Sequence, residues 1–237
     1  MEKSAITNSI TALAMETTGR LGSVAIGTNG QLSDEKTFSG PLRHNAELFD
    51  SIKLLLSKIE KKANQINHVY ISAGPGSFTG VRISVTVAKM MALANKCKIA
   101  AVNTSDVIAL NVADKSINKI GTIIDAKRGQ FFVAVFERIN NVWEKVLPDC
   151  MMTACEFTEK FGNEKISLLG EGLLYYSKKF ETENINILDE KFWSPKAANV
   201  FKLGSKLAAQ GIFTDAVSLV PLYIRKPEAE ENFENRA

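Results

Sequence analysis

The sequence predicts an α/β protein built from two copies of one layered unit, and three observations lead to this prediction. Short apolar runs of strand composition alternate with longer amphipathic segments along the 237 residues. Each half of the chain opens with strands joined by a tight turn and continues with alternating strands and helices. The composition, 45% hydrophobic and 23% charged, suits a globular chain with enough apolar material for a core.

The first half begins with a meander of three strands. Residues 10–15 and 22–28 have strand composition, and a third strand is expected over residues 31–38. Asn29 and Gly30 stand between the second and third runs. Both residues accept positive φ, so the pair is a signal for a two-residue hairpin turn.

An amphipathic helix follows over residues 44–62. Its apolar residues recur at intervals of three and four, which places them on one helical face. These residues are Leu48, Ile52, Leu55 and Ile59, with Phe49 and Leu56 widening the stripe.

The rest of the first half alternates strand and helix. A strand is expected at residues 68–73, a Gly/Pro turn follows it, and residues 79–96 have helix length despite their β-branched side chains. A strand at 98–102 and a helix starting near Thr104 complete the unit. This order of elements is typical of a ribonuclease-H-like layer.

The second half repeats the same order, which predicts an actin-like duplicated fold of two lobes. Its expected elements are strands at 119–126, 129–138 and 143–147, strands at 166–170 and 185–189 alternating with helices, and a helix at 194–210.

We divide the chain near residue 105, although no Pro/Gly-rich linker marks a boundary there. An N-terminal extension covers residues 1–9, the first lobe residues 10–104 and the second lobe residues 105–226. An acidic tail at 227–237 is expected to be disordered. The helix at 194–210 could instead pack back on the first copy.

Composition also excludes several classes of protein. No apolar run approaches the roughly 20 residues that cross a bilayer, and the first residues lack a signal-peptide core, so we expect a cytoplasmic protein. The formal net charge of +3 is weak for a nucleic-acid binder. The three cysteines form no CxxC pair, and the two histidines lie too far apart for an HxxxH metal motif. A metal centre is therefore not expected.

The most specific stretch lies between a predicted strand and a predicted helix. It consists of Gly74, Pro75, Gly76, Ser77, Phe78, Thr79, Gly80, Val81 and Arg82. Backbone N–H groups in such a turn could hold an anion, but the spacing fits neither a P-loop nor a dinucleotide-binding fingerprint. The alternative is a purely structural turn in which Ser77 or Thr79 caps the helix.

This stretch resembles the signature of the TsaB/YeaZ family, and further segments in the same order strengthen the resemblance. They are Glu16-Thr17-Thr18 at the end of the first strand, His44-Asn45 in the first helix, residues 124–129 in the second hairpin and Pro221-Leu222-Tyr223-Ile224-Arg225 near the end. Together these segments span roughly residues 10–226.

The resemblance implies a scaffold rather than an enzyme. Family members are expected to be partners of a TsaD-like catalytic subunit, joined by a TsaE-like ATPase, in the transfer of a threonylcarbamoyl group to N6 of adenosine 37 of tRNA. The metal and the HxxxH motif belong to TsaD, so no catalytic residue, metal or cofactor is expected in this chain. ATP and Mg could bind at the level of the complex, and tRNA is contacted through it. A homodimer is possible when the chain is alone.

The first strand departs from the family pattern at one position. It ends in Glu16, where TsaB-like sequences more often have Asp. The carboxylate of Glu16 and the hydroxyls of Thr17 and Thr18 are the weak candidates for contacts with a Mg-nucleotide. The alternative is a structural turn.

Physical reasoning also favours a docking surface. The helix from Gly80 is apolar on nearly every side, so faces that miss the sheet need a second cover. Either a partner or the second lobe of the chain could supply it. The predicted interface comprises Leu48, Phe49, Ile52, Leu55, Leu56, Ile59, Arg82, Val85, Thr86, Lys89, Met90 and Leu93. Asp at Val85 or Met90 should then abolish association and leave thermal unfolding nearly unchanged.

Two other functions remain open from the sequence. One is a stand-alone actin-like kinase or ATPase, which would bind ATP and Mg tightly by itself. The other is a peptidase, which would cleave peptides and stop with a chelator. A scaffold would do neither.

Overall fold

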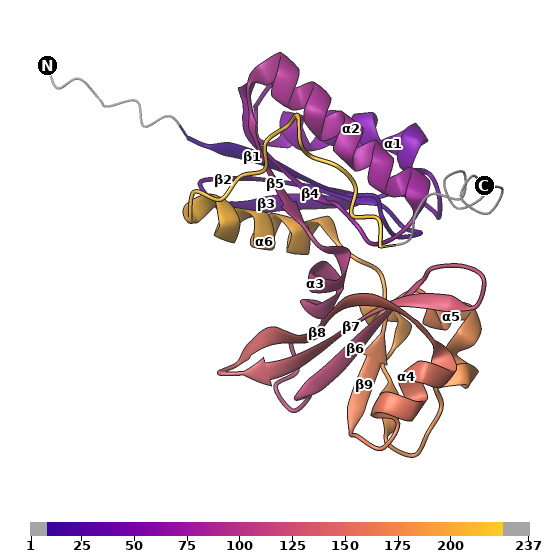
Figure 1. The fold of residues 1–237 in the computed structure, drawn as a ribbon. Coiled ribbons are helices and arrows are strands. Elements are labelled where there is room, and N and C mark those ends of the chain that lie inside the picture. Colours follow the sequence, from indigo (N-terminus) through magenta and orange to yellow (C-terminus); the bar gives the residue numbers. More distant parts are fainter. Residues whose placement is uncertain (1–8, 225–237) are drawn as a thin grey trace, which may run out of the picture.

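The computed structural model describes residues 9–224, which form two lobes stacked one above the other (Figure 1). Each lobe contains one five-stranded sheet. The predicted extension at 1–9, except Ser9, and the predicted acidic tail at 227–237 lie outside the described residues.

The sheet of the first lobe has the strand order β3-β2-β1-β4-β5. Strand β1 lies antiparallel to β2 and parallel to β4. Positive φ angles at Asn29 and Gly30 make the predicted hairpin turn between β2 and β3. The strands are β1 (Thr11–Glu16), β2 (Ser23–Thr28), β3 (Gln31–Thr37), β4 (Ile66–Ser72) and β5 (Lys98–Val102).

Helices cover both faces of this sheet. Helices α1 (His44–Lys58) and α2 (Phe78–Asn95) pack on one face through a core that includes Leu55, Val85 and Leu13. Helix α6 (Ala197–Ala209) packs on the other face, against Ala14 and Tyr70. A short 3-10 turn, η1 (Ala63–Gln65), joins α1 to β4.

The second lobe repeats this topology. Its sheet has the order β10-β9-β6-β7-β8, in which β6 lies antiparallel to β7 and parallel to β9. The strands are β6 (Lys119–Asp125), β7 (Gln130–Ile139), β8 (Val142–Thr153), β9 (Ile166–Leu169) and β10 (Ile185–Ile187). The pairing of β6 with β7 and β9 matches that of β1 with β2 and β4, which confirms the predicted duplicated, actin-like fold.

The helices of the second lobe are shorter. Helix α4 (Ala154–Phe161) covers one face of the sheet with α5 (Leu173–Tyr176) and the turn η2 (Ser177–Phe180). Helix α3 (Thr104–Ala109) covers the other face, beside η3 (Glu190–Phe192). No helix within residues 9–224 is both long and apolar enough to cross a membrane.

Strand β8 is longer than the predicted segment 143–147. The strand continues through Pro148, although proline removes a donor from a sheet ladder. Strand β8 is an edge strand, and its register with β7 shifts between Val133 and Phe136, so the proline is tolerated.

Two segments from the end of the chain return to the first lobe. One is α6, as the alternative reading of the helix at 194–210 expected. The other is the segment 212–224, whose Thr214 bridges to Ile99 and whose Leu219 is buried in the core of the first lobe. The boundary at residue 105 therefore does not separate the lobes cleanly.

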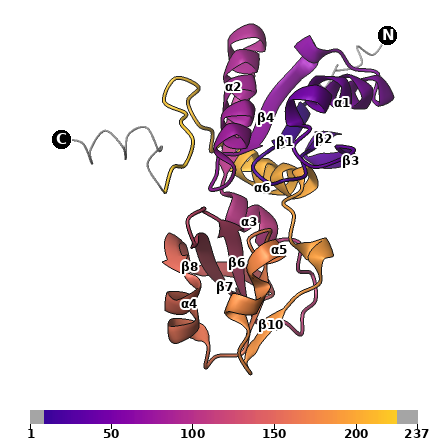
Figure 2. The ribbon, with the colours of Figure 1, turned by 90° about the vertical axis from the view of Figure 1, so that its right-hand side faces the viewer.

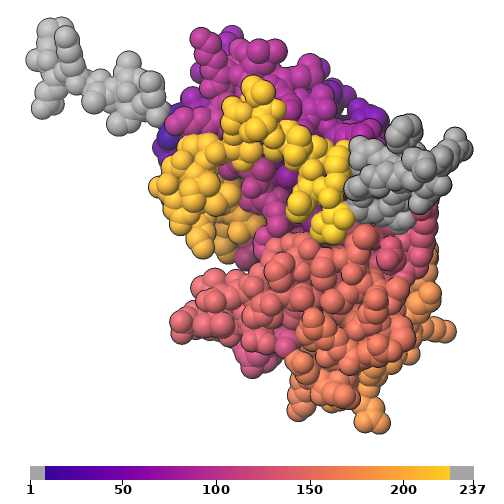
Figure 3. Space-filling model, in the orientation of Figure 1, coloured from indigo at the N-terminus to yellow at the C-terminus, as the bar shows by residue number. Residues whose placement is uncertain are grey.

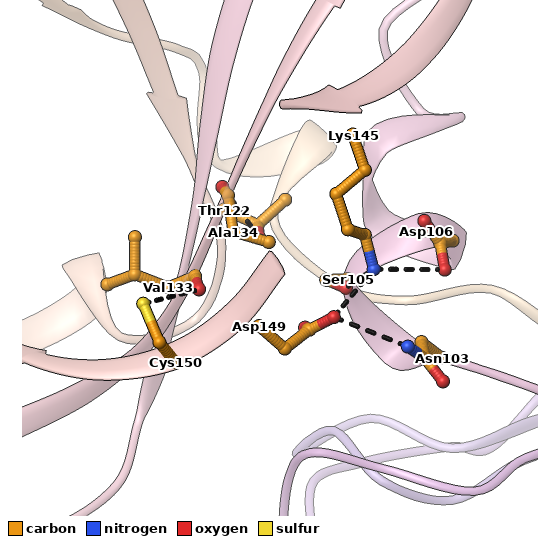
Figure 4. A network of polar contacts seen from close by, with 9 residues as sticks. All are labelled: Asn103, Ser105, Asp106, Thr122, Val133, Ala134, Lys145, Asp149 and Cys150. Carbon is orange, nitrogen blue, oxygen red and sulfur yellow. Dashed lines mark hydrogen bonds and ion pairs between the residues drawn. The ribbon is translucent and has the colours of Figure 1, made fainter. Parts of the chain in front are cut away.

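A polar network lies where the chain passes from one lobe to the other (Figure 4). The ammonium of Lys145 on β8 donates to Asp149 Oδ2 at 2.6 Å, to Ser105 Oγ at 3.1 Å and to Asp106 Oδ2 at 3.2 Å. Asn103 donates to the same oxygen of Asp149 at 3.3 Å. Burial raises the pKa of Asp106, and Lys145 opposes that rise. These contacts tie β8 to the start of α3.

Candidate functional site

The motif at 74–82 forms the turn from β4 into α2. The hydroxyl of Ser77 accepts a hydrogen bond from the backbone N–H of Gly80 at 3.3 Å, which makes Ser77 the N-cap of α2. At Gly80 a Cβ atom would lie 1.8 Å from the carbonyl oxygen of Thr17, so only glycine allows the loop after β1 to approach α2 this closely. The motif therefore shapes the start of α2 and its contact with that loop.

The three nucleotide-contact candidates are buried in this same region. Glu16 Oε1 accepts from the backbone N–H and the hydroxyl of Thr18, both at 2.6 Å, and Oε2 accepts from Ser72. Thr17 donates to the carbonyl of Gly80 at 2.7 Å. A nucleotide could reach the carboxylate only by displacing these contacts.

Burial governs the protonation of the Glu16 cluster. Loss of solvation raises the pKa of Glu16, while the hydrogen bonds from Ser72 and Thr18 lower it by a smaller amount. Nearby, burial lowers the pKa of His44, whose Nε2 lies 3.0 Å from the carbonyl oxygen of Gly19. His44 Nδ1 has no partner and is buried.

The structure divides the predicted interface residues into two groups. Five of them lie inside the first lobe, because the periodic stripe of α1 and the inner side of α2 face the sheet. These are Leu48, Ile52, Leu55, Leu56 and Val85. Ile59 and Lys89 are partly buried, and the exposed members are Phe49, Arg82, Thr86, Met90 and Leu93.

The expectation for Val85 needs correction. Val85 is 6% exposed and belongs to the core of the first lobe. An Asp at this position would bury a charge among apolar side chains, so it would destabilise the fold. Met90 is 62% exposed, so the same change at Met90 leaves the core intact.

A groove of about 580 Å³ runs between α1 and α2. Its rim carries the exposed side chains of Phe49, Phe78 and Met90. Its other lining residues are Asn45, Leu48, Thr79, Arg82, Ile83, Thr86 and Val87. We call this groove, together with the adjacent Leu93, the docking face.

The C-terminal segment 212–224 covers the opposite flank of α2, which sequence reasoning missed. Figure 2 shows α1 and this segment on opposite sides of α2, and Figure 3 shows the segment lying across the first lobe. The ring of Tyr223 stacks on Phe78 with centroids 5.3 Å apart, and its hydroxyl accepts from Arg82 Nε at 2.9 Å. The guanidinium of Arg82 lies 3.7 Å from the centre of the Phe78 ring.

The chain itself thus provides part of the second cover that the apolar α2 requires. The sheet, α1 and the segment 212–224 enclose three of its sides, and the second lobe does not wrap it. The remaining side of α2 is exposed to solvent and carries Met90 and Leu93, which are 62% and 86% exposed.

Comparison with known proteins identifies the family. The family model of TsaD, tRNA N6-adenosine threonylcarbamoyltransferase, matches residues 41–233. A TsaB protein of Bacillus subtilis is 29% identical over 192 residues, which are 79% of this chain and 82% of the relative. The chain belongs to the TsaD-related TsaB/YeaZ family.

Other members of the TsaB/YeaZ family agree in sequence and in fold. The TsaB protein of Escherichia coli is 22% identical over 90% of this chain and 94% of its own length. Both relatives are described as tRNA threonylcarbamoyladenosine biosynthesis proteins. The structure of YeaZ from Pseudomonas aeruginosa superposes with a TM-score of 0.78 at 20% identity, covering 90% of this chain and 99% of that one.

Both histidines of the chain contact neighbouring segments of the first lobe. His44 begins α1 and faces the loop after β1, and His68 lies on β4 with its ring against Phe213. Within residues 9–224, no three His, Cys, Asp or Glu side chains gather as a group able to hold a metal ion.

Proposed function

We propose that this chain takes part in the biosynthesis of threonylcarbamoyladenosine in tRNA as a non-catalytic subunit. It binds a TsaD-like catalytic subunit through the docking face and leaves the transfer of the threonylcarbamoyl group to that subunit. A TsaE-like ATPase joins the complex, and this chain contacts tRNA only indirectly, through the complex. The family membership supports the pathway, and the exposed apolar side chains of α1 and α2 around the groove support the docking role.

The observation that carries the docking role is the exposure of large apolar side chains on adjacent helices. Phe49 on α1 and Phe78 and Met90 on α2 are 55%, 41% and 62% exposed around one groove. Large exposed apolar surfaces of this kind are typical of protein–protein interfaces. Arg82 at the same groove adds a residue type that is enriched at the centre of interfaces.

The buried state of Glu16 supports the absence of an independent nucleotide site at that position. Its carboxylate oxygens already accept hydrogen bonds from Thr18 and Ser72. We propose that ATP and Mg, where the reaction needs them, bind to the assembled complex rather than to this chain alone.

Reconstitution of threonylcarbamoyl transfer tests the function. Purified TsaD-like and TsaE-like subunits are incubated with tRNA, ATP and the threonylcarbamoyl donor, with or without this chain. We expect modified adenosine only when the chain is present, and we expect the chain by itself to transfer nothing. Full modification in its absence would overturn the proposal.

The two alternative functions are tested on the isolated chain. A kinase or ATPase would bind ATP and Mg tightly without partners, and a peptidase would cleave a generic peptide panel and stop with a chelator. We expect neither activity. ATP turnover or chelator-sensitive peptide cleavage by the pure chain would favour the corresponding alternative.

A further inference from the structure

The loop between β1 and β2 contacts the beginnings of both helices of the docking face. The carbonyl oxygen of Gly19 lies 3.0 Å from Nε2 of His44, the first residue of α1. The carbonyl of Arg20 accepts from the backbone N–H of Leu42, which lies just before α1, at 2.8 Å. The first turn of α1 is therefore attached to residues 19 and 20.

The same loop holds the first turn of α2. The carbonyl of Thr18 accepts from the backbone N–H of Ser77, the N-cap residue, at 2.8 Å. The hydroxyl of Thr17 donates to the carbonyl of Gly80 at 2.7 Å. Residues 17–20 thus connect two helices whose sequences lie more than twenty residues away.

One carboxylate of the second lobe fixes this loop from the other side. Glu171, which follows β9, accepts from the backbone N–H of Arg20 at 2.6 Å through Oε2. Its Oε1 accepts from the hydroxyl of Ser194 at 2.6 Å. Both oxygens are thereby engaged, and hydrogen bonds to a charged acceptor are stronger than neutral ones.

The lobes approach each other closely at this contact. A Cβ atom at Gly19 would lie 2.9 Å from two ring carbons of Pro195 and 3.2 Å from Glu171 Oε2. Any side chain at Gly19 would therefore push the loop away from Glu171. The contact depends on this glycine as well as on the carboxylate.

We propose that Glu171 is a positioning residue for the docking face, acting through residues 17–20 on the first turns of α1 and α2. Its hydrogen-bond partners, Arg20 and Ser194, do not line the groove, yet its carboxylate fixes the loop to which both helices are attached. The arrangement of the second lobe is thereby coupled to the shape of a binding surface on the first. The effect on partner binding rests on the proposed function, whereas the effect on the helices does not.

Hydrogen exchange of the isolated chain tests the helical part of the proposal. In Glu171→Ala we expect amides in segments 42–47 and 77–81 to exchange at least about tenfold faster, the lower end of the effect expected for loss of one charged hydrogen bond. Amides of β6 and β7 should keep the wild-type rate. Unchanged exchange in both helix segments would overturn the proposal.

Three further variants separate this contact from a general loss of stability. In Glu171→Gln, the amide oxygen can accept from Arg20 and the amide N–H can donate to Ser194, so exchange should lie closer to the wild-type rate than in Glu171→Ala, with a small remaining increase because the acceptor is neutral. Arg20→Ala removes the side-chain contact with Tyr175 but keeps the backbone N–H, so it should resemble wild type. Gly19→Ala should raise exchange in the same two segments as Glu171→Ala, because its methyl group would push the loop away from Glu171.

Glu171→Ala could unfold the protein, and a milder variant covers that case. Glu171→Asp withdraws the carboxylate by one methylene group and should raise exchange in the same two segments. Fast exchange throughout both lobes in Glu171→Asp as well would show a general structural role and overturn the proposal.

Affinity for the TsaD-like subunit completes the test. Glu171→Ala should bind it about tenfold more weakly, and Glu171→Gln should lose clearly less affinity than Glu171→Ala. If wild type fails to bind while exchange changes as expected, the proposed function fails and the positioning role stands. If wild type binds but Glu171→Ala exchanges like wild type, the positioning role fails alone.

Discussion

The two lobes share one topology but present different outer surfaces. In the first lobe α1, which precedes the fourth strand of its sheet, has 15 residues, and its outer side carries Phe49 and Leu54. In the second lobe α4 has 8 residues, and its exposed positions include Glu156, Glu159 and Lys160. Both helices bury one apolar face on their own sheet. Packing on the sheet therefore constrains only the inner faces of these helices, and the residues on their outer faces can differ between the lobes.

A second comparison concerns the last residue of the matching strands. Glu16 ends β1 and is fully buried, whereas Asp125 ends β6 and has a side chain that is 22% exposed, with an oxygen 2.6 Å from Lys127 Nζ. Equivalent positions in the duplicated sheet thus hold a carboxylate in two environments. In the first lobe this residue belongs to the network that supports α2.

The largest effect is expected at the inner face of α1. Leu55 is fully buried, so Leu55→Ala should lower the free energy of unfolding by about 2–5 kcal/mol through lost burial and a residual cavity. Its neighbour Leu54 is 44% exposed, and Leu54→Ala should change the free energy of unfolding by less than about 0.5 kcal/mol. Denaturant unfolding of both variants measures the difference. Equal losses would mean that the two faces of α1 are assigned incorrectly.

A smaller effect is expected where the C-terminal segment meets α2. Tyr223→Ala removes the stack on Phe78 and should cost about 1 kcal/mol, the usual worth of an aromatic pair. Tyr223→Phe keeps the stack and should cost less. In the second lobe Tyr175 is 71% exposed, so Tyr175→Ala should change the melting temperature least. A greater loss at Tyr175 would contradict this order.

The smallest effect is a dependence on pH at Glu16. Burial raises its pKa in the folded protein above the ordinary value of 4.5. At a pH between the pKa of Glu16 in the unfolded state and its raised pKa in the folded state, the folded state holds more protons than the unfolded state. The contribution of Glu16 to stability is therefore lost as the pH rises through this range. Melting temperatures from pH 4 upward should therefore fall for wild type relative to Glu16→Gln. A constant difference between the two proteins would contradict the raised pKa.

Local patterns were enough to predict most of the fold. Positive-φ residues marked the first hairpin, the spacing of Leu48, Ile52 and Leu55 marked α1, and Ser77 was identified as a candidate cap for α2. The repeated order of elements gave the duplication. Each of these signals depends on neighbouring residues, which are visible in a sequence.

The same signals misplaced part of the candidate interface. A periodic apolar stripe marks the side of a helix that faces its own sheet, so Leu48, Ile52 and Leu55 are core residues. The exposed Phe49 lies one position off that stripe. Which outer side stays open depends on the segment 212–224, whose contacts with α2 span more than a hundred residues and leave no local pattern.

Glu171 was not found from the sequence either. It stands between Gly170 and Gly172, a setting typical of a turn, and no residue spacing relates it to Gly19 or Arg20. Only the packing of one lobe on the other brings them together.

Affinity for the TsaD-like subunit, measured by calorimetry, tests the docking face most directly. Phe49→Asp and Met90→Asp should each weaken binding by at least about 100-fold, because a charge would enter a desolvated apolar interface. Their melting temperatures should match wild type. Val142→Asp, at a 54% exposed position on the second lobe, should bind like wild type. Wild-type affinity in both first-lobe variants, or an equal loss in Val142→Asp, would contradict the assignment of the docking face.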